Sequence, residues 1–361
     1  MTNNILEEDL KDIDEIISLK GDWSSATILI TGCGGFLGFY FMQYFARYGA
    51  RLNLKKIIGL DNFLLGKPEW LTMLQKNYPE LIDLYNFDIS KNDIDKIKGI
   101  NDVRYLIHAA SIASPSFYRK YPLETIDSNI WGLRNILDFY REVKQLKGML
   151  FFSSSEIYGD PDQISIPTNE EYRGNVSCSG PRSCYDESKR FGETLCWVFA
   201  KQYGMPITIA RPFNNYGPGM ALTDKRLPAD FAKNIIGNKD LVIFSNGSPT
   251  RTFCYISDAI IGYLSCLTYG EYDYFNIGND TPEISVREFA KIFQSIGHKV
   301  FGYQGSILYQ TSKDRDYMTD NPNRRCPDIS KARNKLKYNP KVNVQEGVER
   351  YLKFLKEENI K

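Results

Sequence analysis

Tyr185 and Lys189 have the residue types and the spacing of a proton-transfer pair, with Asp-Glu-Ser between them. On a helix, side chains four positions apart share one face, so the ammonium can lie beside the phenol. A nearby cation favours the phenolate and lowers a phenol pKa of about 10 toward neutral pH, which makes the tyrosine a usable base. The pair therefore predicts removal of a hydroxyl proton during oxidation at a carbinol carbon. Because this spacing is common by chance, the prediction depends on the motifs around it.

A glycine-rich turn supplies the first of those motifs. Residues 31–38 read Thr-Gly-Cys-Gly-Gly-Phe-Leu-Gly, between an apolar run at 27–31 and a helical pattern at about 37–48. Glycines at such a turn let the backbone approach a pyrophosphate, and the N-terminus of the following helix faces the negative charge. The turn predicts a dinucleotide site. Its expected contacts are Gly32, Gly35, Phe36, Leu37 and Gly38.

Two acidic residues follow later strands of the same pattern. Asp61 ends the second strand, 23 residues after Gly38, and is followed by Asn62 rather than arginine. A carboxylate there accepts hydrogen bonds from the ribose hydroxyls and repels a 2′-phosphate, so NAD is predicted rather than NADP. Asp88 and Ile89 follow the third strand and are expected to contact adenine. An ordinary strand-ending aspartate is the competing interpretation of Asp88.

The elements that must position these residues follow from short apolar runs that alternate with helical patterns. Such runs favour strands, and the amphipathic stretches between them favour helices. Strands that alternate with helices predict an α/β fold with a doubly wound parallel (Rossmann) sheet. The substrate is expected at the carboxyl edge of that sheet. The expected strands are residues 27–31, 56–60, 83–87, 105–109, 149–153 and 206–210.

The same pattern divides the chain into three parts. Residues 25–212 are predicted to form the NAD-binding Rossmann domain, with a later return near 252–279. Residues 213–361 are predicted to form mainly a smaller C-terminal substrate-binding domain with shorter helices. Residues 1–24 carry apolar side chains at helical spacing, so we expect a helical extension that packs on the body or on a partner subunit. The helices expected in the C-terminal part are residues 225–237, 285–296 and 344–357.

Composition excludes several other classes of protein. With 45 basic and 44 acidic residues the net charge is +1, which gives no reason to expect nucleic-acid or membrane binding. Seven cysteines without metal-ligand spacing and only two histidines argue against a metal site and favour a reducing cytoplasm. No signal peptide or membrane span is expected. His108 ends an apolar run, so a structural role is favoured over catalysis.

Five motifs, in their order and spacing, resemble the extended short-chain dehydrogenase/reductases that act on nucleotide sugars, the NAD-dependent epimerase/dehydratase family. The resemblance runs from about residue 26 to residue 357. It implies NAD as the cofactor, and Ala109, Ala110 and Ser153 as further cofactor contacts. The motifs are Thr31–Gly38, His108–Ala110, Ser153–Gly159, Tyr185–Lys189 and Arg211–Asn214.

The stretch before Tyr158 separates the chemistries within this family. Sugar 4,6-dehydratases have Asp-Glu there, and many 4-epimerases have no carboxylate. Ser155-Glu156 instead resembles the UDP-glucuronate decarboxylases. The segments at 113–118, 180–187 and 325–329 are similar to theirs as well. The resemblance implies catalytic roles for Tyr185, Lys189, Ser154, Ser155, Glu156 and Arg325, and substrate binding by Pro115, Tyr118, Asn214, Arg251 and Arg325.

The implied reaction is oxidation of UDP-glucuronate at C4. Tyr185 takes the hydroxyl proton while NAD accepts the hydride, and the resulting 4-ketone lets carbon dioxide leave from C5. Glu156 and Ser155, with Arg325, are expected to position the ring and manage protonation at C5. The product is UDP-xylose or its 4-keto form. A helix-capping role is the competing interpretation of Glu156.

Three positions depart from the decarboxylase pattern. Ser154 stands for threonine, Cys326 for lysine and Gly219 for arginine, and these changes could alter which sugar or nucleotide is accepted. A nucleotide-sugar epimerase or 4,6-dehydratase is therefore the first alternative, and a non-catalytic NAD-binding scaffold the second. The resemblance also implies a homodimer that pairs through helices at about 125–146 and 183–203.

Overall fold

A seven-stranded parallel sheet forms the centre of the computed structural model, which describes residues 3–312, 316, 319 and 321–359. The strands lie in the order β11-β6-β5-β4-β1-β2-β3, so the chain adds strands outward from β1 first on one side and then, starting with β4, on the other. Every neighbouring pair of strands is parallel. The predicted doubly wound sheet is confirmed. Its strands are β1 (Thr27–Thr31), β2 (Lys56–Asp61), β3 (Ile82–Asn86), β4 (Val103–His108), β5 (Gly148–Phe152), β6 (Ile207–Pro212) and β11 (Asp273–Ile277).

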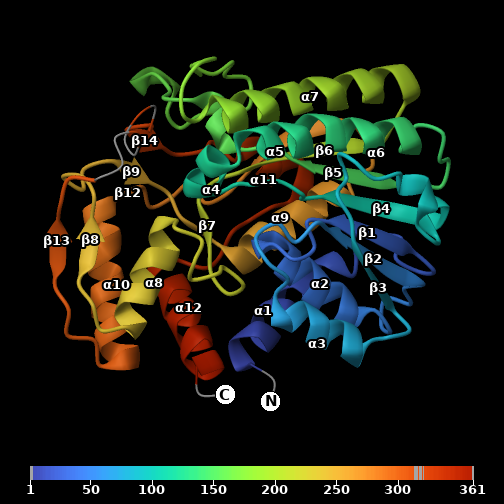
Figure 1. The fold of residues 1–361 in the computed structure, drawn as a ribbon. Helices are drawn as coiled ribbons and strands as arrows, with labels where there is room; N and C mark the ends of the chain where they lie inside the picture. The colour runs from blue at the N-terminus through green and yellow to red at the C-terminus, as the bar shows by residue number, and fades with distance from the viewer. Residues whose placement is uncertain (1–2, 313–315, 317–318, 320, 360–361) are drawn as a thin grey trace.

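Helices cover both faces of this sheet because side chains alternate along its strands. Ile28 and Ile30 of β1 pack into one core, whereas Leu29 between them packs into the other. Figure 1 shows the resulting layers, with α5, α6 and α7 on one side of the strands and α2 and α3 on the other. These helices are α2 (Phe36–Tyr48), α3 (Glu69–Asn77), α5 (Pro122–Ile126), α6 (Leu133–Tyr140) and α7 (Ser183–Tyr203). A further helix, α9 (Ile256–Leu267), packs into the same core as α2.

The helix expected at about 125–146 differs from the structure in its bounds. It begins at Pro122, because proline has the backbone angle of a first helical residue and needs no N–H donor there. A π-helical turn (Asp127–Gly132) joins α5 to α6, and the helix ends at Tyr140. The chain then turns back, and the Lys147 N–H donates to the Arg104 carbonyl beside β4.

The C-terminal part lies beside the carboxyl ends of the strands, at the left of Figure 1. It contains two-stranded and three-stranded sheets, while α9 and β11 return to the large sheet. Its elements are β7 (Asn215–Tyr216), α8 (Leu227–Ile236), β8 (Leu241–Ile243), β9 (Thr250–Arg251), β10 (Cys254–Tyr255), β12 (Ile284–Ser285), α10 (Val286–Phe301), β13 (Ile307–Tyr309), β14 (Arg324–Arg325), α11 (Ser330–Leu336) and α12 (Val344–Asn359).

The N-terminal extension forms α1 (Asn4–Ile17), which packs on the body against α9, α2 and α12. Asp9 of α1 is completely buried, and its carboxylate accepts hydrogen bonds from the hydroxyls of Tyr40 (2.6 Å) and Tyr255 (2.8 Å) and from Arg350 (2.9 Å). Asn3, which caps α1, donates to the Phe354 carbonyl of α12 over 3.3 Å. The two chain ends therefore meet, as Figure 1 shows. Residues 1 and 2 of the predicted extension lie outside the described residues.

In the part of the chain that the structure describes, we find no helix with the length and apolar character needed to cross a membrane.

Candidate active site

The glycine turn between β1 and α2 folds tightly on one side and is open on the other. Gly32 has a φ of +71°, and a Cβ there would lie 2.7 Å from the Ala109 carbonyl oxygen. A Cβ at Gly38 would lie 2.5 Å from two carbonyl oxygens of the turn, whereas a Cβ at Gly35 would meet only the Gly32 carbonyl, at 3.3 Å. No side chain caps the first N–H groups of α2. The turn thus has the form of a pyrophosphate cradle.

Asp61 joins this turn to the loop that follows β2. Its two carboxylate oxygens accept from the backbone N–H groups of Gly34 (2.9 Å) and Phe63 (2.8 Å). Burial raises the pKa of Asp61, and the two backbone hydrogen bonds oppose that rise. The Asn62 side chain accepts from the Leu64 N–H (3.1 Å) within the same loop. Each carboxylate oxygen can accept a further hydrogen bond, so Asp61 fits a ribose hydroxyl donor.

A cavity of about 990 Å³ extends from the glycine turn across the carboxyl ends of the strands to the C-terminal part. Its size and position suit a dinucleotide with a second ligand beside it. The predicted site residues that line it are Gly32, Gly35, Phe36, Leu37, Gly38, Ala109, Pro115, Tyr118, Ser153, Ser154, Ser155, Glu156, Tyr185, Lys189, Asn214, Arg251 and Arg325.

Some predicted cofactor contacts are not among the lining residues, namely Asp61, Asn62, Asp88, Ile89 and Ala110. The Asp88 carboxylate holds its own turn by accepting from the N–H (3.0 Å) and hydroxyl (2.6 Å) of Ser90. The Ile89 side chain is buried against Gly132. Their contact with adenine stays a prediction.

Tyr185 and Lys189 lie on one face of α7, both buried, with the Lys189 Nζ 5.7 Å from the centre of the Tyr185 ring. The ammonium donates to the Phe152 carbonyl at the end of β5 over 2.7 Å, and burial lowers its pKa to about 7. Burial raises the pKa of Tyr185 to about 12. A hydrogen bond with Ser154 opposes this rise, while Lys189 is directed at the Phe152 carbonyl. The lowered phenol pKa predicted from the sequence, which also depends on the positive charge of a bound nicotinamide, stays a prediction.

Several polar atoms around this pair are buried without a hydrogen-bond partner. They are the hydroxyls of Ser111, Ser153 and Tyr118, and the Tyr118 ring stacks on Tyr185 with a centroid distance of 5.1 Å. Buried polar atoms normally have partners, so these hydroxyls mark where a polar ligand fits. The sequence reading missed Ser111, although its place after Ala109-Ala110 at the end of β4 could have indicated it.

Glu156 lies in a short 3₁₀ turn (Ser155–Tyr158) that follows β5, and its carboxylate lies between two guanidinium groups. Arg325 of β14 binds both of its oxygens, one over 2.7 Å, and Arg182 binds the same oxygen from just before α7. Burial alone raises the pKa of Glu156, but the two cations lower it to about 2. The carboxylate is therefore ionised at neutral pH, and it binds arginine side chains rather than capping a helix.

Arg251 of β9 lies on the same side of the cavity. It donates to the carbonyls of Thr250 (2.7 Å), Pro322 (2.6 Å) and Asn323 (3.2 Å). Burial, together with the charge of Arg325, lowers its pKa to about 9. A buried cation whose described contacts are carbonyl oxygens suits an anionic group in the cavity.

The sequence reading missed Arg226, which precedes α8 and lines the cavity. Its guanidinium donates to Asp224 over 2.8 Å and lies 5.4 Å from the centre of the Phe36 ring in the glycine turn. Gly219, where the decarboxylase pattern has arginine, is packed against Phe39, and a Cβ there would lie 2.6 Å from that ring. The lost cation therefore reflects a close contact between this loop and α2.

The model of the NAD dependent epimerase/dehydratase family matches residues 28–278. The chain belongs to this family. A UDP-glucuronic acid decarboxylase 1 of Xenopus tropicalis is 32% identical over 331 residues, which cover 92% of this chain and 72% of the relative. One of Arabidopsis thaliana is 33% identical over 323 residues, covering 90% and 68%. The resemblance stated from the motifs is confirmed.

Solved structures of other family members share the fold. The UDP-glucuronic acid 4-epimerase of Bacillus cereus, in complex with UDP-glucuronic acid and NAD, is 26% identical with a TM-score of 0.73, over 92% of this chain and 99% of its own. The UDP-glucose 4-epimerase of Thermotoga maritima has a TM-score of 0.79 at 24% identity, over 92% and 99%, which supports the fold alone.

Proposed function

We propose that this chain is an NAD-dependent decarboxylase of UDP-glucuronate that forms UDP-xylose or its 4-keto form. The observation that carries the proposal is the Arg182–Glu156–Arg325 cluster, in the same cavity as Tyr185 and Lys189. An arginine that binds a carboxylate side chain is suited to a sugar carboxylate too. Relatives that match about 90% of this chain are named UDP-glucuronic acid decarboxylases.

The hydride pair acts at C4 of the sugar in this proposal. Tyr185 removes the C4 hydroxyl proton, and Lys189 turns from the Phe152 carbonyl to stabilise the phenolate and hold a ribose hydroxyl. When bound, NAD supplies the hydride acceptor at C4 and returns the hydride later. The C4 ketone lies β to the C6 carboxylate, so the electrons left by carbon dioxide delocalise into it.

The remaining predicted residues divide between the two ligands. Arg325 binds the sugar carboxylate and Arg251 the diphosphate, beside Pro115, Tyr118 and Asn214. Ser154, Ser155 and Glu156 position the ring; an ionised Glu156 is a proton acceptor rather than a donor.

The two ligands also define the proposed domains. Residues 25–212, with a return near 252–279, form the NAD-binding domain, and residues 213–361 form mainly the substrate-binding domain. The proposed location of the protein is the cytoplasm. The proposed NAD contacts are Gly32, Gly35, Phe36, Leu37, Gly38, Asp61, Asn62, Asp88, Ile89, Ala109, Ala110, Ser153, Tyr185 and Lys189.

The experiment is incubation of the protein with NAD and UDP-glucuronate, with carbon dioxide trapped and nucleotide sugars analysed by mass spectrometry. We expect carbon dioxide and a UDP-pentose or UDP-4-keto-pentose. UDP-glucose, which has no carboxylate, is the control and should release none. Unchanged UDP-glucuronate with no carbon dioxide would sink the proposal.

A 4-epimerase of UDP-glucuronate is the second candidate, favoured by the likeness to the Bacillus cereus structure. The same experiment separates the two, because an epimerase keeps the carboxylate and its product has the mass of the substrate. A product that has the mass of UDP-glucuronate but separates from it in chromatography would favour this candidate.

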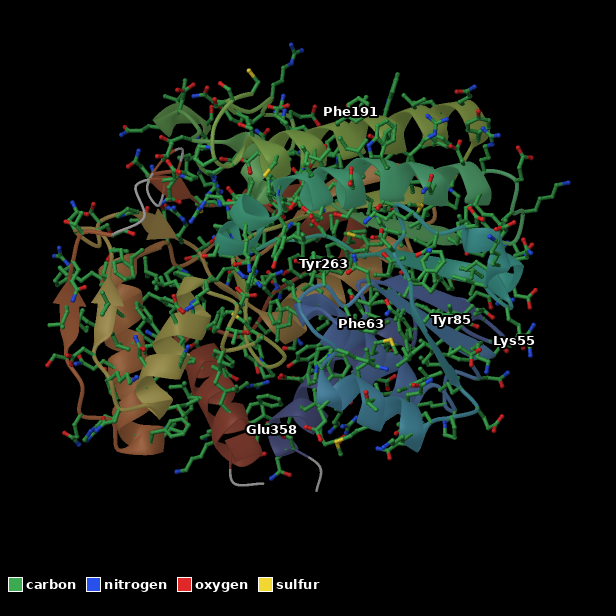
Figure 2. The ribbon with its side chains drawn as sticks, viewed as in Figure 1. Lys55, Phe63, Tyr85, Phe191, Tyr263 and Glu358 are labelled. Atoms are coloured by element: carbon green, nitrogen blue, oxygen red, sulfur yellow. The ribbon has the colours of Figure 1, made fainter. Side chains whose placement is uncertain are left out.

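We further propose a homodimer in which a second copy covers α5, α6 and α7. Large apolar side chains are exposed on this layer, among them Trp131 (58%), Trp197 (49%) and Leu123. Phe191 of α7 is exposed there as well, as Figure 2 shows. Exposed apolar groups of this size are typical of subunit interfaces. Light scattering should give twice the monomer mass, and Trp197→Glu should shift it toward the monomer. A monomer at micromolar concentration for the unaltered protein would exclude this interface.

A further inference from the structure

Glu156 is bound by two arginines that come from different parts of the chain. Arg182 precedes Tyr185 by three residues at the start of α7, whereas Arg325 lies on β14 in the C-terminal part. Both guanidinium groups are almost completely buried. A single arginine is enough to neutralise the charge of one carboxylate, so the presence of the second arginine beside Glu156 has to be explained.

Arg182 is held in place by more than Glu156. Its Nε lies 3.5 Å from a carboxylate oxygen of Asp186, one turn further along α7. Its guanidinium lies 6.0 Å from the centre of the Tyr118 ring, which in turn stacks on Tyr185. Arg182 therefore has fixed neighbours on α7 and on α4 (Pro115–Lys120), next to the hydride pair.

Arg325 differs from Arg182 in this respect. The side-chain contacts described for Arg325 are both to Glu156. An anionic group that enters the cavity competes for this guanidinium directly. Arg325 is thus the partner that can exchange Glu156 for a ligand, while Arg182 keeps Asp186 and the Tyr118 ring as neighbours.

The exchange would leave Glu156 in a difficult state if Arg182 were absent. A buried carboxylate without a cation is neutralised by a proton, because burial penalises its charge. A second carboxylate nearby would raise its pKa further. With Arg182 in place, Glu156 keeps a charge-assisted hydrogen bond and stays ionised.

We propose that Arg182 is a positioning residue that keeps Glu156 ionised while Arg325 transfers to the carboxylate of the substrate. This inference rests on the proposed function. The two negative charges, one on Glu156 and one on the sugar, then share a buried site; loss of carbon dioxide moves the sugar's charge to the enolate oxygen, and protonation at C5 removes it. Arg182 thereby links the ionised Glu156 to the start of α7, the helix that carries Tyr185 and Lys189.

Other charged and titratable groups face Glu156, and none replaces Arg182. Asp186 is negative when ionised, and Arg251 is held by backbone carbonyls of its own region. The groups that face Glu156 are Asp186 and Tyr185 from α7, Arg182 just before it, Arg325 from β14, Arg251 from β9 and Tyr118 from α4.

The test counts the protons taken up when UDP-glucuronate binds, by titration calorimetry near pH 6 in buffers of different ionisation enthalpy. All proteins carry Tyr185→Phe so that no turnover occurs, and NAD is present at saturation. Arg182→Met should take up about one proton more than the protein with Arg182, since a buried unpaired carboxylate has a pKa of about 8–9. Arg182→Lys, which keeps the charge, should restore the original count.

Two controls make the result specific. Lys201→Met removes an exposed cation from the far end of the same helix and should leave the count unchanged. UDP-glucose should show no difference between variants, because Arg325 has no carboxylate to bind. Equal proton counts for Arg182 and Arg182→Met with UDP-glucuronate would overturn the inference.

Folding and binding failures are told apart by separate measurements. Circular dichroism and NAD binding report whether Arg182→Met folds, and Arg182→Gln takes its place if it does not. Failure of the protein with Arg182 to bind UDP-glucuronate would overturn the proposed function as well as this inference. Binding with unchanged proton counts overturns this inference alone.

Discussion

At the scale of single residues, the partners of Tyr185 explain its chemistry better than its spacing to Lys189 does. The spacing predicts a shared face, which the structure has, but not where the ammonium is directed. Lys189 donates to the Phe152 carbonyl, and Ser154 is the partner of the phenol. In the proposed reaction, Tyr185 has a raised pKa before the ligands bind, and Lys189 turns from the carbonyl toward the phenol when they do.

Tyr185→Phe removes this base and keeps the stacked ring. We expect kcat to fall by about 10²–10⁴-fold, the usual contribution of a positioned base, with NAD binding unchanged. Quenching of protein fluorescence by NAD and the rate of product formation measure the two effects. Activity equal to that of the unaltered protein would show that another group is the base.

Contacts between residues far apart in sequence are the part of the site that composition and motifs indicated least. Arg325 and Glu156 are 169 positions apart, and each was predicted by its own motif. Arg182 lies within the 180–187 segment that resembles the decarboxylases, but no role was predicted for it, because its contact with Glu156 depends on tertiary packing. Such contacts depend on how the C-terminal part closes over the sheet.

At the scale of elements, local pattern predicted six of the seven strands of the sheet within two residues, and it also predicted the glycine turn. Apolar runs set the positions of the central strands directly, since those strands are buried on both faces. The remaining strand, β11, was predicted only as part of the return near 252–279. The helix at 122–140 was placed less well, because a π-helical turn has no distinct periodicity. The loop at Gly219 was read only as a lost cation, whereas its contact with Phe39 depends on tertiary packing.

Gly219→Ala tests that contact between the loop and α2. Gly219 has a φ of +84°, which costs an alanine roughly 1–2 kcal/mol, and the clash with Phe39 adds about 1–3 kcal/mol. Gly204→Ala is the matched control, because Gly204 has a φ of +65° and no neighbouring atom within 4 Å of its Cβ position. Urea unfolding should show a larger loss for Gly219→Ala; equal losses would mean that Phe39 moves aside freely.

At the scale of the whole molecule, α1 connects parts of the chain that are otherwise separate. Asp9 receives hydrogen bonds from α2, from the residue before α9 and from α12. The family model matches residues 28–278, so Asp9 and Arg350 lie outside it while Tyr40 and Tyr255 lie within it. Sequence periodicity predicted the helix, but nothing in the sequence indicated that a buried carboxylate would join three elements.

Asp9→Asn tests the clasp through its pH dependence. Burial raises the pKa of Asp9 to about 6 from its unfolded value of 3.8, despite the opposing hydrogen bonds and Arg350. A raised folded pKa gives stability that is full below about pH 3.8 and lost as the pH rises through 6. Unfolding free energies between pH 4 and 7 should fall for the unaltered protein relative to Asp9→Asn, by on the order of 2–3 kcal/mol.

Glu8→Gln, which changes an exposed carboxylate of the same helix, is the control for this measurement and should leave the pH slope unchanged. Parallel curves for Asp9→Asn and the unaltered protein would show that Asp9 does not titrate in this range.

The contact of Asn3 with Phe354 also links two segments that are synthesised far apart in time, because the two residues are 351 positions apart. During synthesis α1 can pack on α2 and α9 before α12 has been made, but the part of its face that α12 covers stays open until α12 emerges. That face is apolar and includes residues such as Leu6, Leu10 and Ile13. The surface of α1 is therefore covered in steps, and α12 supplies the later one.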